Sequence, residues 1–265
     1  MTFGELFAGI GGFGLGLERA GMKCKWQVEI DPYAARVLEK NWAGVERFAD
    51  VRDFTPTEEK YVDVICGGFP CQDISLASRT GAGISGKKSG LWSEFSRIIG
   101  LARPKYVIIE NSPVLSSRGL DRVLADLATL GYDAEWSVVP ASAVGAPHRR
   151  DRLWIVAYAN CEHDAMRGDR EDLPEGVACR ESDTGGSLGD CWQGCEAESG
   201  QGACDGPATI ETTDWWEAEP DVDRVADGVP HRVDRLRCLG NAVVPQIVEQ
   251  IGRLIMAKEE KSCRG

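Results

Sequence analysis

One cysteine in this 265-residue sequence lies in an unusually constrained loop. The stretch GGFPCQDIS (67–75) follows an apolar run at 61–65 and places Cys71 directly after Pro70. Two glycines and a proline fix the backbone in a way that packing alone does not require, so they favour a reactive cysteine over a small buried side chain. A cysteine is nucleophilic as its thiolate, which partial exposure near a helix N-terminus favours. The stretch therefore indicates a nucleophile after a strand.

A glycine loop and a carboxylate form a second group. Gly9, Gly11 and Gly14 in FAGIGGFG (7–14) have the spacing G-x-G-x-x-G, and Glu29 ends the next expected strand. Glycines let the backbone approach a ligand at a helix N-terminus, and the carboxylate can accept hydrogen bonds from ribose hydroxyls. The pattern favours an adenosine-type cofactor over a merely tight turn. By itself it does not separate a dinucleotide from S-adenosylmethionine.

The elements that must position these residues alternate between strand and helix. Strands are expected at 2–7, 25–30, 61–65, 105–110, 134–139 and 153–159, and helices at 13–20, 32–42, 93–102, 121–130 and 242–255. This alternation predicts an α/β fold with a Rossmann-like, doubly wound sheet, whose ligands lie at the carboxyl ends of the strands. The glycine loop and the cysteine loop would therefore open on the same edge.

Acidic residues are concentrated in one part of the chain. Residues 158–221 hold 17 of the 42 Asp and Glu side chains but only three of the 30 Lys and Arg, which leaves 25 acidic and 27 basic side chains elsewhere. The segment is rich in Gly and Ser and lacks apolar periodicity. We therefore expect a catalytic and cofactor-binding domain at 1–157, an acidic insertion at 158–228, and a C-terminal segment at 229–265 that returns to the first domain.

The ten cysteines do not indicate disulfides. The sequence opens without a signal-peptide pattern and has no run of about 18 apolar residues, so we expect reduced thiols in a cytoplasmic protein that does not span a membrane. No tight C-x-x-C pair occurs in the insertion, so free thiols are favoured over zinc there and no metal site is predicted. The residues weighed as zinc ligands are Cys161, His163, Cys179, Cys191, Cys195 and Cys204.

Five blocks together resemble the DNA (cytosine-5) methyltransferases of the Dcm-like bacterial or phage type. They are ELFAGIGGFGLGLERAG, GGFPCQDIS, IIENSP, GAPHRRDRLWIVAYA and LGNAVVPQ, in the order in which the family carries them. The resemblance covers residues 1–157 and about 229–257, and the Pro-Cys, Glu-Asn and Arg-x-Arg blocks make it highly specific. It implies a methyltransferase that uses S-adenosylmethionine and releases S-adenosylhomocysteine.

The resemblance also implies a covalent mechanism. Cys71 would attack C6 of a cytosine flipped out of duplex DNA, so that C5 can take the methyl group. Glu110 would protonate or hydrogen-bond N3 of the cytosine, an acid role that favours a raised pKa. Arg152 would contact cytosine O2, and Arg150 would support the site. His148 stands where the family usually has glutamine, which changes the donor pattern of this block.

Cofactor and DNA contacts follow from the same resemblance. Glu29 would hold the ribose, Ile30 would pack on adenine, and Asp50 with Val51 would contact adenine; Asp53 is a weaker candidate for that role. The full expected cofactor set is Phe7, Gly9, Ile10, Gly11, Gly12, Glu29, Ile30, Asp50, Val51, Pro70, Leu91, Asn241 and Ala242. The expected DNA contacts, beside the nucleophile and in the cationic loop 76–90, are Gln72, Arg79, Lys87 and Lys88.

In this family the insertion would be the target-recognition region. Its acidity repels phosphates, so base contacts would come from few residues, and the more basic stretch 223–238 would support the DNA face. The candidates are Arg167, Arg170, Arg180, Trp192, Trp215 and Trp216.

We expect a monomer that acts on duplex DNA, with a companion restriction endonuclease. Two alternatives remain open, a tRNA cytosine-5 methyltransferase of the same family and a catalytically inactive DNA-binding protein. A nicotinamide-dependent dehydrogenase is excluded, because nothing in that function requires the Pro-Cys or Glu-Asn blocks.

Overall fold

The computed structural model describes residues 1–70, 90–160 and 230–262. The predictions for Cys71, Gln72, Arg79, Lys87 and Lys88 lie outside these residues, as do those for the arginines, tryptophans and potential zinc ligands of the insertion. Among the residues that are described, no helix is long and apolar enough to cross a membrane.

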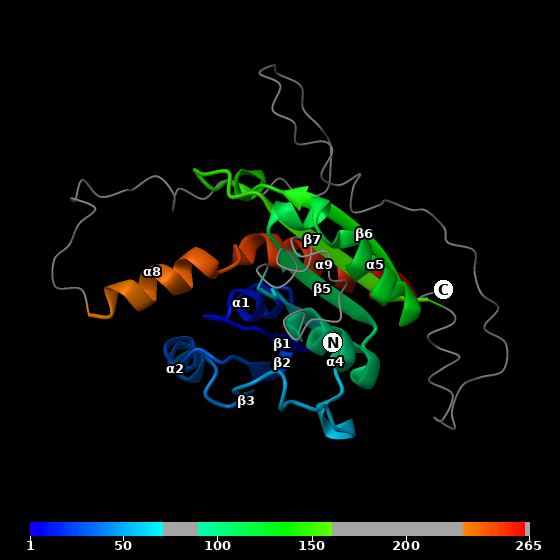
Figure 1. Ribbon diagram of the computed structural model, residues 1–265, viewed down its shortest axis with the longest axis horizontal. Coiled ribbons are helices and arrows are strands. Elements are labelled where there is room, and N and C mark those ends of the chain that lie inside the picture. Colours follow the sequence, from blue (N-terminus) through cyan, green and yellow to red (C-terminus); the bar gives the residue numbers. More distant parts are fainter. Residues whose placement is uncertain (71–89, 161–229, 263–265) are drawn as a thin grey trace, which may run out of the picture.

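A seven-stranded sheet lies at the centre of the fold, with the strand order β3-β2-β1-β4-β5-β7-β6 (Figure 1). Strands β1 to β5 are parallel, whereas β7 runs antiparallel to both β5 and β6. The predicted α/β class is thus confirmed, with a mixed rather than wholly parallel sheet. The strands are β1 Thr2–Leu6, β2 Lys23–Val28, β3 Glu46–Phe48, β4 Val64–Gly67, β5 Tyr106–Asn111, β6 Tyr132–Val139 and β7 Arg152–Ala159.

The strand order reverses between β1 and β4. From β1 the chain winds outward through β2 to β3, and from β4 it winds the other way to β5. Ligands of doubly wound sheets bind at such a switch point, outside the carboxyl ends of the strands. The glycine loop leaves β1 and the cysteine loop leaves β4, so the topology brings both to this point.

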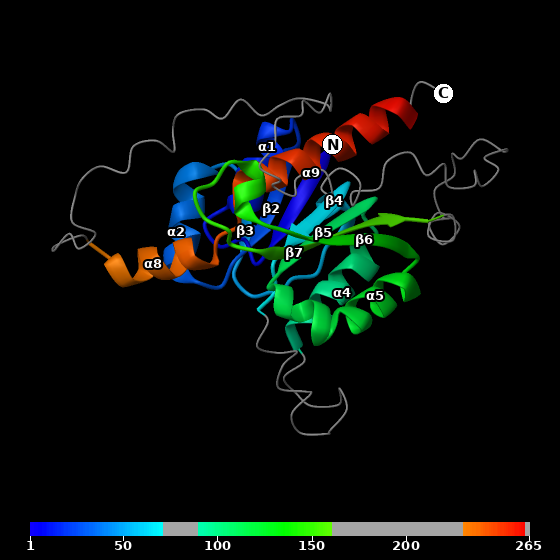
Figure 2. The same ribbon diagram turned by 90° about the horizontal axis from the view of Figure 1, so that it is seen from above.

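Helices cover the two faces of the sheet (Figure 2). One apolar core lies between the sheet and α4 and α5, and a second lies between the sheet and α1 and α9. The helices are α1 Gly12–Arg19, α2 Pro32–Asn41, α4 Gly90–Ala102, α5 Leu120–Thr129, α8 Arg232–Asn241 and α9 Pro245–Ser262, with short 3₁₀ turns η1 Glu58–Lys60, η2 Pro113–Ser117 and η3 Ala141–Val144.

The C-terminal helix α9 packs on α1, and glycines of both helices lie at the contact. A Cβ added to Gly16 would lie 2.6 Å from the carbonyl oxygen of Pro245, and one added to Gly252 would lie 2.7 Å from the Cβ of Ala20. The two helix backbones therefore approach closely because neither position carries a side chain. Residues 245–262 thus complete a core that begins with the first helix of the chain.

Three features differ from the expected elements. Strand β2 spans Lys23–Val28 rather than 25–30. Because it ends at Val28, Glu29 lies just past its end. The short edge strand β3 and the helix α8 were not predicted. On α9 the sequence left open whether Leu254 or Ile255 faces the core, and Ile255 is the buried one.

Candidate active site

The segment that leads into Cys71 is held against the end of β5. Gly68, Phe69 and Pro70 follow β4, and the side chain of Phe69 is buried while Pro70 is exposed. The amide Nδ2 of Asn111, the last residue of β5, donates a hydrogen bond to the carbonyl oxygen of Phe69 at 2.9 Å. The backbone before the cysteine is therefore fixed beside the neighbouring strand.

Glu110 lies next to this segment. A Cβ added to Gly68 would stand 2.7 Å from Glu110 Oε2, so this position admits no side chain unless the carboxyl group moves. Burial raises the pKa of Glu110 to about 7, against the lowering effects of Arg152 and Arg150. A carboxyl group with this pKa is partly protonated near neutral pH and can donate a proton.

Arg152 is the ion-pair partner of Glu110. Its Nε lies 3.0 Å from Glu110 Oε1, and its side chain remains 27 % exposed. The direction of β7 explains why Arg152 reaches Glu110. Because β7 runs antiparallel to β5, it begins at the edge of the sheet where β5 ends. In the register of the two strands Asn111 pairs with Leu153, which places Arg152 at the carboxyl end of β5. The exposed part of the guanidinium is left to contact a ligand.

Arg150 binds the C-terminal segment instead. Its Nη2 donates hydrogen bonds to the carbonyl oxygens of Gly240 at 2.8 Å and Ala242 at 2.6 Å. Its backbone is in the left-handed region, with a φ of 39°. Burial, and then the neighbouring charge of Arg152, lower the pKa of Arg150. The segment just before β7 is therefore tied to the C-terminal end of α8.

The glycine loop has the backbone that its sequence predicts. Gly9 and Gly11 have positive φ angles of 56° and 86°, and Gly11 precedes the first turn of α1. A Cβ at Gly9 would meet nothing within 4 Å, so this part of the loop faces open space. Phe7 also has a positive φ, and its ring stacks on Phe95 at a centroid distance of 6.1 Å.

Glu29 is oriented by two backbone N–H groups. Gly9 N donates to its Oε2 at 2.6 Å and Asp31 N donates to its Oε1 at 2.7 Å. A carboxylate accepts about four hydrogen bonds, so capacity remains for two hydroxyls of a ribose. Ile30 is 63 % exposed, which is unusual for an isoleucine and offers an apolar surface to a base. These residues fit the adenosine part of S-adenosylmethionine.

The expected adenine pair, Asp50 and Val51, has other contacts. The carboxylate of Asp50 accepts a hydrogen bond from Arg52 N at 2.9 Å and three more from the Arg52 guanidinium, and these bonds lower the pKa of Asp50 to about 2. Val51 is 5 % exposed and packs in the core under α4. Its carbonyl oxygen accepts a hydrogen bond from Arg97 Nη2 of α4 at 3.2 Å.

The remaining expected cofactor residues come from two other segments. Leu91, at the start of α4, is partly buried against the core of that face. Asn241 ends α8 and is exposed, and Ala242 caps that helix. The next residue, Val243, lies so close to the glycine loop that a Cβ on Gly12 would stand 2.7 Å from its Cγ2. The segment 241–243 therefore lies beside the glycine loop.

Sequence reasoning missed a buried polar pair beneath the glycine loop. Glu5 is completely buried in β1, where its Oε1 accepts from Gly14 N at 3.3 Å and its Oε2 accepts from Gln27 Nε2 at 3.0 Å. Burial raises the pKa of Glu5 to about 8. A glutamate within the apolar strand TFGELF, directly before the glycines, is the signal that could have identified it.

Comparisons with known proteins identify the family. The family model described as C-5 cytosine-specific DNA methylase matches residues 1–187. The Type II methyltransferase M.Eco47II of Escherichia coli is 40% identical over 164 residues, which cover 59% of this chain and 39% of that protein. The Type II methyltransferase M.HhaI of Haemophilus parahaemolyticus is 32% identical over 167 residues, 60% of this chain and 50% of that one. The matches thus span half or less of each relative.

Solved structures share the fold. A putative DNA modification methyltransferase encoded within an Escherichia coli prophage has a TM-score of 0.51 and 25% identity, covering 68% of this chain and 52% of that one. A DNMT2 variant of Spodoptera frugiperda has a TM-score of 0.52 and 20% identity, covering 67% and 56%. Both the family and the fold are those of S-adenosylmethionine-dependent methyltransferases. Because the family model matches more than half of its length, the chain belongs to the C-5 cytosine-specific DNA methylases.

Proposed function

We propose that this protein transfers a methyl group from S-adenosylmethionine to C5 of a flipped cytosine in duplex DNA. The observation that carries the proposal is the Glu110–Arg152 pair, which lies beside the segment leading into Cys71 at the switch point of the sheet. The acid Glu110, the cation Arg152 and the segment that leads into the nucleophile Cys71 therefore lie together at the edge where ligands of this fold bind.

Glu110 is the acid in this proposal. The pKa of about 7 lets it hold a proton near neutral pH and share it with N3 of the cytosine as the Cys71 sulfur adds to C6. The new S–C6 bond places electron density on C5, which bonds to the methyl group as the bond between that group and the sulfonium sulfur breaks, leaving S-adenosylhomocysteine. Loss of the C5 proton to a base then restores the C5–C6 double bond and releases the thiolate of Cys71.

Arg152 has two tasks. Its Nε holds Glu110 Oε1 at 3.0 Å and so orients the carboxyl group. Its Nη1 donates to the carbonyl oxygen of Asp151 at 2.8 Å, so its Nη2 would donate to the carbonyl O2 of the cytosine, where negative charge grows as the sulfur adds to C6. Arg150 acts indirectly in this proposal, because its Nη2 donates to the carbonyl oxygens of Gly240 and Ala242.

The cofactor-binding residues lie on the β1 and β2 side of the edge. When bound, S-adenosylmethionine supplies a methyl group on a positively charged sulfur. Glu29 would bind the ribose hydroxyls, Ile30 would pack on the base, and the loop at Gly9 would leave room for the ligand. Segment 241–243 would close the other side of the glycine loop.

Two further points belong to the proposal. The acidic insertion at 158–228 would read the DNA sequence. The protein would act as a monomer, which light scattering after size-exclusion chromatography would test.

Because relatives are named Type II methyltransferases, we also infer a companion restriction endonuclease. Bisulfite sequencing of DNA from cells that express the protein would report the methylated motif that such an endonuclease must share.

The central experiment compares wild type with Cys71→Ser and, as a matched control, Cys238→Ser on α8. We expect wild type and the Cys238 variant to transfer labelled methyl groups to duplex DNA and to form a trapped complex with 5-fluorocytosine DNA. The Cys71 variant should do neither while still binding S-adenosylhomocysteine. Labelling of tRNA but not DNA would instead support the tRNA alternative, and labelling by the Cys71 variant at the wild-type rate would refute the mechanism.

A further inference from the structure

Helix α8 is attached to the described parts of the chain by polar contacts rather than by a core. None of its residues is buried, and its apolar side chains Val233, Leu236 and Leu239 are 78 %, 58 % and 62 % exposed. It lies beside α2 at one end of the sheet in both views of the molecule (Figures 1 and 2). The position of this helix therefore depends on a small number of side-chain contacts.

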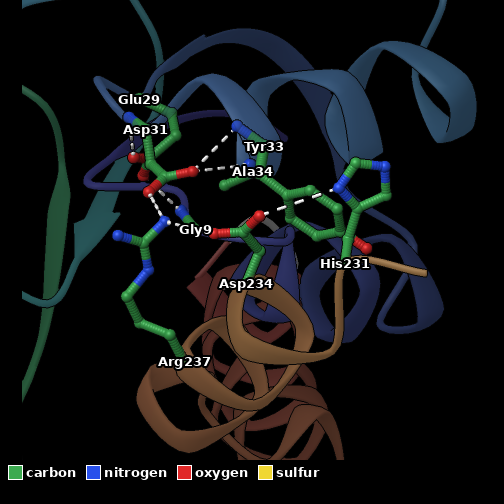
Figure 3. A network of polar contacts seen from close by, with 8 residues as sticks. All are labelled: Gly9, Glu29, Asp31, Tyr33, Ala34, His231, Asp234 and Arg237. Carbon is green, nitrogen blue, oxygen red and sulfur yellow. Dashed lines mark hydrogen bonds and ion pairs between the residues drawn. The ribbon is translucent and has the colours of Figure 1, made fainter. Parts of the chain in front are cut away.

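The first of these contacts joins α8 to the start of α2. Arg237 Nη2 lies 2.5 Å from Asp31 Oδ2, and 3.3 Å from Asp234 Oδ1 on its own helix. The rings of His231 and Tyr33 add a contact at a centroid distance of 5.8 Å. These side chains face one another across the gap between the two helices (Figure 3).

Asp31 connects this ion pair to the cofactor site. While Oδ2 faces Arg237, Oδ1 caps α2 by accepting from Tyr33 N at 2.8 Å and Ala34 N at 3.0 Å. The backbone N–H of Asp31 donates to Glu29 Oε1 at 2.7 Å, and the other oxygen of Glu29 accepts from Gly9 N. A continuous series of contacts thus runs from α8 to the glycine loop (Figure 3).

The other end of α8 is attached to the catalytic edge. Arg150 donates to the carbonyl oxygens of Gly240, within the helix, and Ala242, just after it. Arg150 precedes Arg152 by two residues, and Arg152 pairs with Glu110. Through Arg237 this weakly packed helix therefore contacts Asp31, whose backbone orients Glu29, and at its C-terminal end it is bound by Arg150.

We propose that Arg237 is a positioning residue of the cofactor site, which through Asp31 orients Glu29 and couples cofactor binding to the docking of α8. The proposal rests on the proposed role of Glu29 as ribose ligand. Coupling between two equilibria is reciprocal. If docking of α8 strengthens cofactor binding by a certain factor, bound cofactor favours the docked α8 by the same factor. Cofactor occupancy thereby also stabilises the segment that Arg150 holds.

The expected effect is modest because the ion pair is partly exposed. The side chains of Arg237 and Asp31 are 54 % and 24 % exposed. Partly exposed ion pairs contribute little free energy, so losing this pair should weaken the binding of S-adenosylhomocysteine by about two- to fivefold. Salt screens such a pair, so the difference should shrink in about 0.5 M NaCl.

The first test is a double-mutant cycle on the affinity for S-adenosylhomocysteine, measured by calorimetry. Arg237→Gln removes one charge, and Asp31→Asn removes the other while keeping the oxygen that caps α2. Each single variant should bind about two- to fivefold more weakly, and the double variant no more weakly than either single one. Arg235→Gln, the same change on the same helix, is the control and should bind like wild type. Unchanged binding by Arg237→Gln, or additive losses in the double variant, would overturn the proposal.

Hydrogen exchange gives a readout that a loss of overall stability would not produce. S-adenosylhomocysteine should slow amide exchange across residues 232–239, which exclude the expected cofactor contacts Asn241 and Ala242, in wild type and in Arg235→Gln, but not in Arg237→Gln, with α9 exchanging equally in all three. Equal protection of α8 in Arg237→Gln would overturn the coupling alone. Failure of wild type to bind the ligand at all would overturn the cofactor site and the coupling with it.

Discussion

Glu110 and Arg152 meet at 3.0 Å because one strand of the sheet runs against the others. Glu110, near the end of β5, supplies a carboxyl group at the edge where ligands bind. Arg152, at the start of β7, supplies a cation at the same edge of the sheet. Burial keeps the pKa of Glu110 near 7 despite the nearby guanidinium, so the pair holds an acid and a hydrogen-bond donor side by side. Four predictions test the surroundings of this pair, the buried glutamate beneath the glycine loop, and the contact between α1 and α9.

Glu110→Gln should abolish the acid step. The acid must be protonated to act, so wild-type methyl transfer should be retained below pH 7 and decline as the pH rises through about 7. The amide cannot give up a proton, so the variant should be slower by roughly 10²–10⁴-fold and should lack this decline. Single-turnover transfer of labelled methyl groups between pH 6 and 9 measures both effects. Glu58→Gln, in the exposed turn η1, is the control, and a variant that kept the wild-type profile would exclude Glu110 as the acid.

Gly68→Ala should displace the Glu110 carboxyl group. The added Cβ would stand 2.7 Å from Glu110 Oε2, well inside contact distance. We expect methyl transfer to fall at least tenfold, since misplacing a reacting group by about 1 Å costs up to 10²-fold, with little change in S-adenosylhomocysteine affinity. Gly44→Ala adds the same methyl group where nothing lies within 4 Å, and should leave the rate unchanged. Equal rates for the two variants would show that the contact at Gly68 is unimportant.

Glu5→Gln should change how stability depends on pH. Burial raises the folded-state pKa of Glu5 to about 8, whereas an unfolded glutamate titrates near about 4.3. Between these values the folded state holds a proton that the unfolded state lacks, so this contribution to stability is complete below pH 4 and is lost as the pH rises through about 8. Urea unfolding of wild type between pH 5 and 8.5 should therefore show a decline that is smaller in the variant. If the free energy of unfolding declined equally steeply with pH in wild type and in the variant, the raised pKa of Glu5 would be contradicted. Glu18→Gln, on the exposed side of α1, is the control.

Gly252→Ala should separate α9 from α1. Its Cβ would stand 2.7 Å from the Cβ of Ala20, and overpacking of this kind costs about 1–3 kcal/mol. Gly240→Ala, in a helix but facing open space, should change the free energy of unfolding by less than about 1 kcal/mol and is the comparison. Urea unfolding at constant pH measures both, and equal stabilities of the two variants would mean that the helices can separate without cost.

The sequence predicted the local elements that have strong local signals. The Asp31–Pro32 pair begins α2 as expected, with the aspartate as the capping side chain, and the glycine spacing produces the predicted loop before α1. The apolar run at 105–110 corresponds to β5, whose six residues are all buried. Each of these signals acts over a few residues, so no knowledge of the rest of the fold is required.

What could not be predicted depends on distant parts of the chain. Strand direction is set by which neighbour a strand pairs with, and nothing within 153–159 distinguishes a parallel from an antiparallel β7. Helix α8 buries none of its residues, so no core contact accounts for it. The raised pKa of Glu5 depends on burial that α1 and its loop create. The pairing of Arg237 with Asp31 joins segments that no local pattern relates.

The contact between α1 and α9 has a consequence for biosynthesis. The apolar surface of α1, including Phe13 and Leu17, is completed by residues 247–255, which leave the ribosome long after it. Until then a nascent chain displays that surface to chaperones and to other unfinished copies. Stalled or prematurely ended translation should for this reason yield aggregation rather than a smaller working protein.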